Sequence, residues 1–146
     1  MKLQFMFLGK KNPNNLHTMI TKYVNRLSKY AKIELHFLNE KNTTKLEQRI
    51  FTKNQSNSYF IILDEKGKQV SSIQYANLIN EIMFTCSNIV FLIGESYGFP
   101  QEIINRVSCK ISLSKMTFPH MIARLLILEQ TYRAYSILNH HPYHHE

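Results

Sequence analysis

Two glycines follow an apolar run in the second half of the chain. The run Asn88–Ile93 (NIVFLI) stops at Gly94, and Gly98 comes four residues later. Glycine lets backbone approach a ligand closely or adopt a positive φ. Backbone N–H and C=O groups in such a loop can read the edge of an adenine ring, so the segment is a candidate ligand loop. The alternative is an ordinary turn between a strand and a helix.

Two other apolar runs end in the same way. Leu63 closes the run Ser58–Leu63, and Leu113 closes the run Cys109–Leu113 and leads into Ser114-Lys115-Met116-Thr117-Phe118. In open α/β sheets, ligands bind at the carboxyl ends of the strands. We therefore expect these three ends to build one binding site.

The stretch after Pro119 carries the polar groups best suited to an anionic substrate. Arg124 and Arg133 lie nine residues apart, and their forked donors can hold a phosphate or the carbonyls of a base. An ion pair with Glu129, four residues earlier on a helix, is the alternative for Arg133. For His120, helix capping or dimer packing is as good an interpretation as catalysis.

The last residues are rich in histidine, with His140, His141, His144 and His145 around Pro142-Tyr143. A metal site is disfavoured, because no cysteine or carboxylate cluster accompanies the histidines except Glu146, and nothing fixes a tetrahedral geometry. An interrupted affinity tag fits poorly as well. We expect no metal.

Several enzyme classes lose support because their motifs are absent. The sequence has no Walker phosphate loop, GxGxxG, GxSxG or HExxH, which weakens the case for a kinase, dehydrogenase, hydrolase or metalloprotease. The net charge of +8 favours a polyanionic partner such as nucleic acid. Cys86 and Cys109 form no CxxC pair, and no apolar run approaches the roughly 20 residues that span a bilayer. We expect a cytoplasmic protein without a membrane segment.

These groups need a scaffold of alternating strands and helices. Apolar periodicity predicts strands at residues 2–8, 33–38, 58–63, 88–93 and 109–113, with helices at 16–30, 43–53, 71–83, after Pro100 and at 119–138. Residues 64–68 (DEKGK) are expected to form a charged turn, and Thr43 or Thr44 to cap the second helix. The alternation predicts one α/β domain with a mostly parallel sheet and helices on both faces.

The chain resembles the pseudouridine-N3 methyltransferases of the bacterial large ribosomal subunit, which belong to the SPOUT superfamily. The resemblance rests on FLIGESYGF (91–99), LSKMTFPHMIARLLILEQTYRA (113–134) and HPYHHE (141–146). MKLQFMFLGK at the start and ILDEKGKQVSSIQYA (62–76) in the middle are also similar, so it covers the whole chain.

The resemblance implies a SPOUT domain over 1–146, with a C-terminal trefoil knot and cofactor site in about 88–146; knots are rare exceptions to chain topology. It implies S-adenosylmethionine as cofactor, a homodimer with active sites built from both subunits, and a pseudouridine of 23S rRNA in the assembled ribosome as substrate. The positions that match the cofactor site are Leu63, Gly94, Leu113, Ser114, Lys115, Met116, Thr117 and Phe118.

The resemblance also suggests roles at the end of the chain. Tyr143 and His144, with Arg133, are the expected catalytic residues, His144 as base or base-orienter. Arg124, Arg133 and His145 are expected to bind substrate. The family usually has Gly-Gly where this chain has Gly94-Glu95, and a terminal Arg or Lys where it has His145. Other interpretations are a SPOUT enzyme that methylates tRNA and an inactive relative that only binds RNA.

Overall fold

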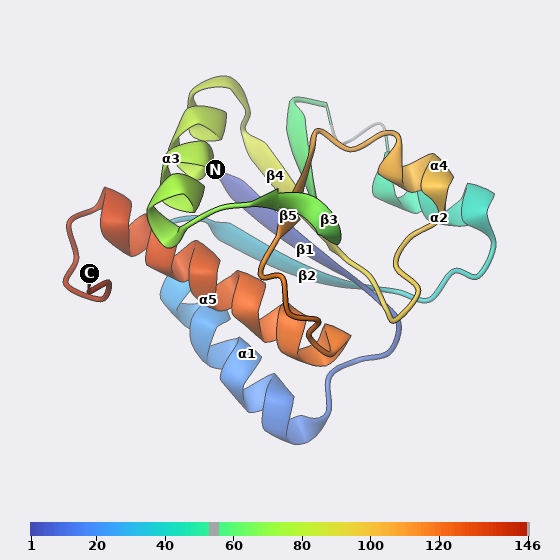
Figure 1. Ribbon diagram of the computed structural model, residues 1–146, viewed down its shortest axis with the longest axis horizontal. Helices are drawn as coiled ribbons and strands as arrows, with labels where there is room; N and C mark the ends of the chain where they lie inside the picture. Colours follow the sequence, from blue (N-terminus) through green and yellow to red (C-terminus); the bar gives the residue numbers. More distant parts are fainter. Residues whose placement is uncertain (53–55, 146) are drawn as a thin grey trace.

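The computed structural model describes residues 1–52 and 56–145, in which five strands and five helices alternate along the chain (Figure 1). The elements are β1 (Lys2–Leu8), α1 (Asn14–Leu27), β2 (Lys32–Leu38), α2 (Thr43–Ile50), β3 (Ser58–Gln69), α3 (Ser72–Thr85), β4 (Asn88–Ile93), α4 (Gln101–Ile104), β5 (Cys109–Ser112) and α5 (His120–Leu138). The bounds predicted for β1 and β4 are confirmed to the residue.

The strands form one sheet in the order β2-β1-β4-β3-β5, and each neighbouring pair runs parallel. This arrangement confirms the predicted α/β domain. The carboxyl ends of β4, β3 and β5 consequently lie side by side at one edge of the sheet. The order also places β1 between β2 and β4, so the ends of β1 and β4 are neighbours.

Helices cover both faces of the sheet, as predicted. On one face α1 and α3 both pack against α5 (Figure 1). The side chains of Leu3, Phe5 and Phe7 join that core, and Phe5 stacks on Phe91 with 4.6 Å between ring centroids. Met6 points to the opposite face, into a smaller core with Leu46 of α2 and Ile103 of α4. Alternate residues of β1 therefore serve two cores, which explains why its second half, Phe5–Leu8, is apolar without interruption.

The charged turn predicted for residues 64–68 is wrong, because β3 continues through it to Gln69. Leu63 and Lys68 both pair with Ile111 of β5, so the residues between them bulge out of the ladder. Gly67 closes this bulge against β5: a Cβ added there would lie 2.8 Å from the Ile111 backbone. The charges suggested a turn, but a glycine that lets two backbones touch keeps the segment in the sheet.

Helix starts follow local hydrogen bonding. Ser71 caps α3: its hydroxyl accepts from Gln74 N–H, and the Gln74 side chain accepts from Ser71 N–H. For α2 the predicted caps, Thr43 or Thr44, are wrong, because the Asn42 side chain accepts from Lys45 N–H. The predicted end of α2 at Lys53 lies outside the described residues.

Candidate functional site

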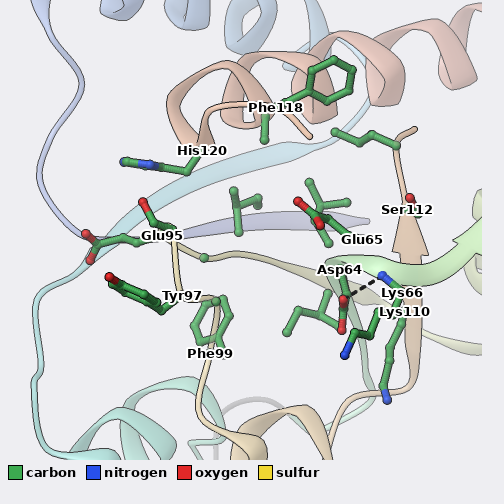
Figure 2. A pocket seen from close by; sticks show the side chains of 18 of the residues that line it. Asp64, Glu65, Lys66, Glu95, Tyr97, Phe99, Lys110, Ser112, Phe118 and His120 are labelled. Carbon is green, nitrogen blue, oxygen red and sulfur yellow. Dashed lines mark hydrogen bonds between the residues drawn. The ribbon is translucent and has the colours of Figure 1, made fainter. Parts of the chain in front are cut away.

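A hollow of about 590 Å³ opens at the carboxyl ends of β3, β4 and β5 (Figure 2). Most of the residues predicted from the strand ends line it, namely Leu63, Gly94, Leu113, Ser114, Met116 and Phe118. Lys115 and Thr117 belong to the same segment but are exposed and do not line the hollow. The strand-end rule therefore locates this hollow.

Two glycines shape the loop after β4. A Cβ added to Gly94 would lie 2.9 Å from the Gly98 Cα, a separation that real Cβ atoms do not show. Gly98 has a φ of 69° and donates its N–H to the Glu95 carbonyl at 2.8 Å. The loop folds back on itself, and both glycines are needed for distinct reasons: Gly94 for close approach and Gly98 for its dihedral.

The segment after β5 is held by its own serines. Ser112 Oγ donates to the Ser114 carbonyl at 2.9 Å, and Met116 N–H donates to Ser114 Oγ at 3.0 Å. This turn leaves Met116 73% exposed and Phe118 36% exposed at the rim. A tight turn of this kind places apolar side chains where they can cover a ligand.

Charged side chains stand around the hollow. Asp64, Glu65 and Lys66 from the β3 bulge, with Lys110 of β5, lie at one side, while Glu95 and His120 lie at the other (Figure 2). Asp64 accepts from Lys66 N–H at 2.9 Å. Sequence reasoning missed the bulge residues because it assigned them to a turn. Their position directly after Leu63 was the available signal.

The Glu95 side chain leaves the centre of this hollow and lies over Gly9, at the end of β1 (Figure 2). Its Oε1 is 2.9 Å from the place where a Gly9 Cβ would stand, and Gly9 has a φ of 108°. The carboxylate also acts on Arg124: burial lowers the pKa of the Arg124 guanidinium, and Glu95 opposes that shift.

A second hollow of about 340 Å³ adjoins the first and shares Glu95 and His120 with it. It lies over the ends of β1 and β2, and its lining residues are Leu8, Gly9, Lys10, Leu38, Asn39, Glu40, Lys41, Glu95, His120 and Met121. The two hollows therefore meet at Glu95 and His120. Its lining carries two lysines, Lys10 and Lys41, and two glutamates, Glu40 and Glu95.

The three predicted catalytic residues come together in a cluster, which we call the tail cluster, made of Glu129, Arg133, Tyr143 and His144. Glu129 Oε1 accepts from Arg133 Nε at 3.1 Å and Nη2 at 2.6 Å, and from Tyr143 OH at 3.0 Å. Arg133 Nη1 lies 3.1 Å from His144 Nδ1. The ion pair that was the alternative for Arg133 is therefore present, within a larger network.

The whole chain can be compared with known proteins. A family model described as "Predicted SPOUT methyltransferase" matches residues 1–144. The chain belongs to this family. It is 38% identical to "Ribosomal RNA large subunit methyltransferase H" of Parabacteroides distasonis, over all of both chains, and 34% identical to the protein of that name from Malacoplasma penetrans, over 99% of each.

Solved structures of low identity share the fold. A probable methylase family protein from Haemophilus influenzae aligns with a TM-score of 0.61 at 9% identity, over 99% of this chain and 70% of that one. The SpoU methyltransferase AviRb from Streptomyces viridochromogenes, solved in complex with the cofactor AdoMet, aligns with a TM-score of 0.55 at 14% identity, over 89% of this chain and 56% of that one. Both likenesses support the SPOUT fold alone.

Within this SPOUT domain the tail cluster stands far from the two hollows. His120 lines both hollows and Arg133 lies thirteen residues further along α5, so at about 1.5 Å per residue they are roughly 20 Å apart. The tail leaves the C-terminal end of α5, opposite to the end that begins at His120 (Figure 1). The chain therefore gathers its predicted catalytic residues, but not at these hollows.

Arg124 has a different place from the one its predicted role suggests. Its side chain is fully buried and lies outside the residues that line either hollow. Nη2 donates to the Leu8 carbonyl at 3.0 Å, and Nη1 donates to the Lys10 carbonyl at 2.8 Å and to Asn12 Oδ1 at 2.9 Å. The guanidinium carbon lies 5.0 Å from the Phe7 ring centroid. Arg124 thus ties α5 to the segment that follows β1.

The remaining predictions concern the last two residues, a metal site and a membrane segment. His145 is exposed, and Glu146 lies outside the described residues. In the described part of the chain, no three or more His, Cys, Asp or Glu side chains are grouped so as to hold a metal ion. None of the described helices has the length and apolar character needed to cross a membrane.

Proposed function

We propose that this protein transfers a methyl group from S-adenosylmethionine to N3 of a pseudouridine in 23S rRNA. The observation that carries the proposal is the full-length similarity to proteins named for methylation of large-subunit ribosomal RNA, at 34–38% identity in the two relatives described above. The net charge of +8 supports an RNA partner.

The larger hollow suits the cofactor. Its volume of about 590 Å³ is in the range of small-molecule sites, and it combines apolar walls from Leu63, Leu113 and Phe118 with backbone at Gly94. A side chain at Gly94 would collide with Gly98, so the close-packed loop leaves backbone groups facing the hollow. We assign Leu63, Gly94 and residues 113–118 to cofactor binding, Lys115 and Thr117 through their backbone. Bound there, S-adenosylmethionine supplies a methyl group on a positively charged sulfur.

The adjoining hollow suits the target nucleotide. It meets the larger one at Glu95 and His120, so a base held in it would face the methyl group. Lys10 and Lys41 at its rim would bind phosphates, which position RNA without reading its sequence. Arg124 would contribute indirectly, by fixing the backbone of the segment that carries Lys10.

The separation of the tail from the hollows supports a homodimer in which the tail of one subunit completes the active site of the other. Tyr143, His144 and Arg133 would then act on the base, and His145 would contact the RNA backbone. Of the apolar side chains of α5, Ile122 is 43% exposed and remains available for such an interface, while Leu128 and Tyr132 are buried in the core. Gel filtration at micromolar concentration should give a dimer, and a monomer would contradict the proposal.

Further properties follow from the family. We propose a C-terminal trefoil knot within about 88–146, which would fix the cofactor loops relative to one another. We also propose that the protein acts in the cytoplasm on the assembled ribosome, as its similarity to proteins named for methylation of large-subunit ribosomal RNA suggests.

Mass spectrometry of 23S rRNA from cells with and without the gene tests the function. A methylated pseudouridine that disappears with the gene and returns with the gene on a plasmid is the expected result. If tRNA loses a methyl group instead, the target assignment is wrong. If no RNA changes and calorimetry detects RNA binding but no S-adenosylmethionine binding, the protein is an RNA-binding relative without activity.

A further inference from the structure

The hydrogen bonds of the tail cluster have directions that can be assigned. An ionised carboxylate accepts only, and a guanidinium donates only. Tyr143 OH, 3.0 Å from Glu129 Oε1, must therefore donate its one proton to Glu129. Tyr23 OH lies 3.2 Å from Tyr143 OH, so Tyr23 is the donor in that pair. Burial and the neighbouring Tyr23 and Glu129 raise the pKa of Tyr143, which keeps the phenol protonated.

The same rule fixes the proton of His144. Its Nδ1 lies 3.1 Å from Arg133 Nη1, and because the guanidinium can only donate, Nδ1 must present its lone pair. The single proton of the neutral ring is then on Nε2. Which nitrogen of a histidine carries the proton is normally set by the bond that the other nitrogen makes.

The cluster holds this arrangement firmly. Arg133 is fixed through Nε and Nη2 on Glu129, so its remaining nitrogen Nη1 is aimed at His144. The side chains of Arg133 and Glu129 are only 24% and 15% exposed. The Tyr143 ring lies under Arg133 at 4.8 Å and meets the edge of Tyr132 at 4.8 Å. The tail therefore holds His144 in one orientation and one tautomer, with Nε2 buried in the single chain, so a base reaches Nε2 by displacing the side chains that cover it.

We propose that His144 acts as a hydrogen-bond donor, giving its Nε2–H to a carbonyl oxygen of the target base, and that it is not the base that removes the N3 proton. The proposal rests on the function proposed above. Arg133 is then a positioning residue, which acts on the substrate through His144.

The chemistry balances without a basic side chain in the tail. The N3–H bond breaks and its proton passes to water. N3 forms a bond to the methyl carbon as the carbon–sulfur bond breaks and its electron pair stays on sulfur. Negative charge spreads from N3 onto the neighbouring carbonyl oxygens as the proton leaves. A donor aimed at one of those oxygens is worth most at that moment, as in an oxyanion hole.

Two substitutions separate the possible roles. The amide nitrogen of glutamine replaces Nε2, whereas the amide of asparagine reaches only to the position of Nδ1. His144→Gln should keep methyl transfer within about tenfold of the wild-type rate, because the donor remains. His144→Asn should lose about 10²- to 10³-fold, the cost of removing one oxyanion-hole donor. Calorimetry with S-adenosylmethionine, expected to be unchanged in both, is the control for folding.

Other patterns overturn the proposal. Equal and large losses in both variants indicate a general base. Activity kept by His144→Asn and lost by His144→Gln indicates that only the Arg133 contact matters. Activity kept by both removes His144 from the reaction. If the wild-type protein methylates no RNA, the proposed function itself fails, which is a separate result.

A second readout does not depend on activity. Nitrogen-15 NMR of the imidazole rings distinguishes a protonated from an unprotonated ring nitrogen. In the wild-type protein at a pH where the ring is neutral, His144 should show its proton on Nε2 alone, while the exposed His141 shows a mixture. Arg133→Met should turn His144 into a mixture as well. A proton on His144 Nδ1 in the wild type would refute the assignment.

Discussion

The two ends of α5 carry arginines that use their donors in opposite ways. Arg124 is fully buried and binds the carbonyls of Leu8 and Lys10, which belong to the backbone of the fold. Arg133 keeps a side chain that is 24% exposed and binds Glu129 and His144, which are side chains. Backbone partners hold the start of the helix to the sheet. Side-chain partners position the tail groups, which can also contact a substrate.

The two ends of α5 therefore have different structural roles. The first turn of α5 stands at the junction of the two hollows, where a shift of the backbone would move both walls. The last turns support a tail whose groups are about 20 Å away, too far to act on the same hollows. The start of α5 must be rigid to keep the walls of the hollows in place. The end of α5 must place the tail groups in the second subunit of the proposed dimer. Substitutions at the two ends should consequently affect different measurements.

Deletion of residues 141–146 should have the largest effect. Methyl transfer should fall by at least about 10²-fold, because the deletion removes the His144 donor and the loss of one oxyanion-hole donor costs about 10²- to 10³-fold. Cofactor affinity should stay the same, because residues 141–145, the described part of the deleted segment, do not line the larger hollow. Radiolabelled methyl transfer and calorimetry measure the two quantities. Retained transfer would mean that the tail takes no part in catalysis.

The two arginines should then respond differently to the same substitution. Arg124→Met leaves the Leu8 and Lys10 carbonyls without their donor, at about 1–3 kcal/mol each, so the free energy of unfolding should fall by about 2–6 kcal/mol. Arg133→Met removes a partly exposed ion pair and should cost about 1 kcal/mol or less, yet it should reduce methyl transfer. Urea denaturation measures both costs. Similar costs for the two variants would erase the distinction between the two ends of α5.

Substitution at the cofactor loop should leave the tail unaffected. Gly94→Ala places a Cβ 2.9 Å from the Gly98 Cα, so the loop must shift and cofactor affinity should fall by about tenfold. Gly98→Ala is the matched control: nothing lies within 4 Å of its Cβ, and only the strain of a positive φ opposes it. It should mainly reduce stability, by about 1 kcal/mol. Calorimetry should rank Gly94→Ala as the weaker binder of the two.

The larger hollow was predictable because two rules agree on it. Apolar runs ending at Leu63, Ile93 and Leu113 mark buried strands, and parallel strands bring their carboxyl ends to one edge. The Arg133–Glu129 pair was also readable, since its spacing is that of neighbours on a helix. In both cases the signal lies within a short stretch of sequence.

The adjoining hollow and the burial of Arg124 were not predictable in this way. Lys10 follows β1 and Lys41 follows β2, so the two side chains line the same hollow because these strands pair. No local pattern of sequence reveals the order of strands in a sheet. A charged residue on a helix is normally exposed. Arg124 is buried because carbonyls left at the end of β1 accept from it, and these partners are more than 100 residues away in sequence.

Glu95 gives the smallest predicted effect and tests how far the two hollows act separately. Glu95 stands where the resemblance suggests that the family usually has glycine. The Glu95 side chain lies over Gly9, between the two hollows, and points away from the centre of the larger one. Glu95→Gly should therefore change cofactor affinity by no more than about threefold. Removing a negative charge beside Lys10 should instead tighten RNA binding modestly, and more so at low salt. Glu95→Gln, which keeps the size and loses the charge, should reproduce the RNA effect. A cofactor affinity that rises tenfold in Glu95→Gly alone would mean that the side chain narrows the cofactor hollow, and the wall would then belong to both sites.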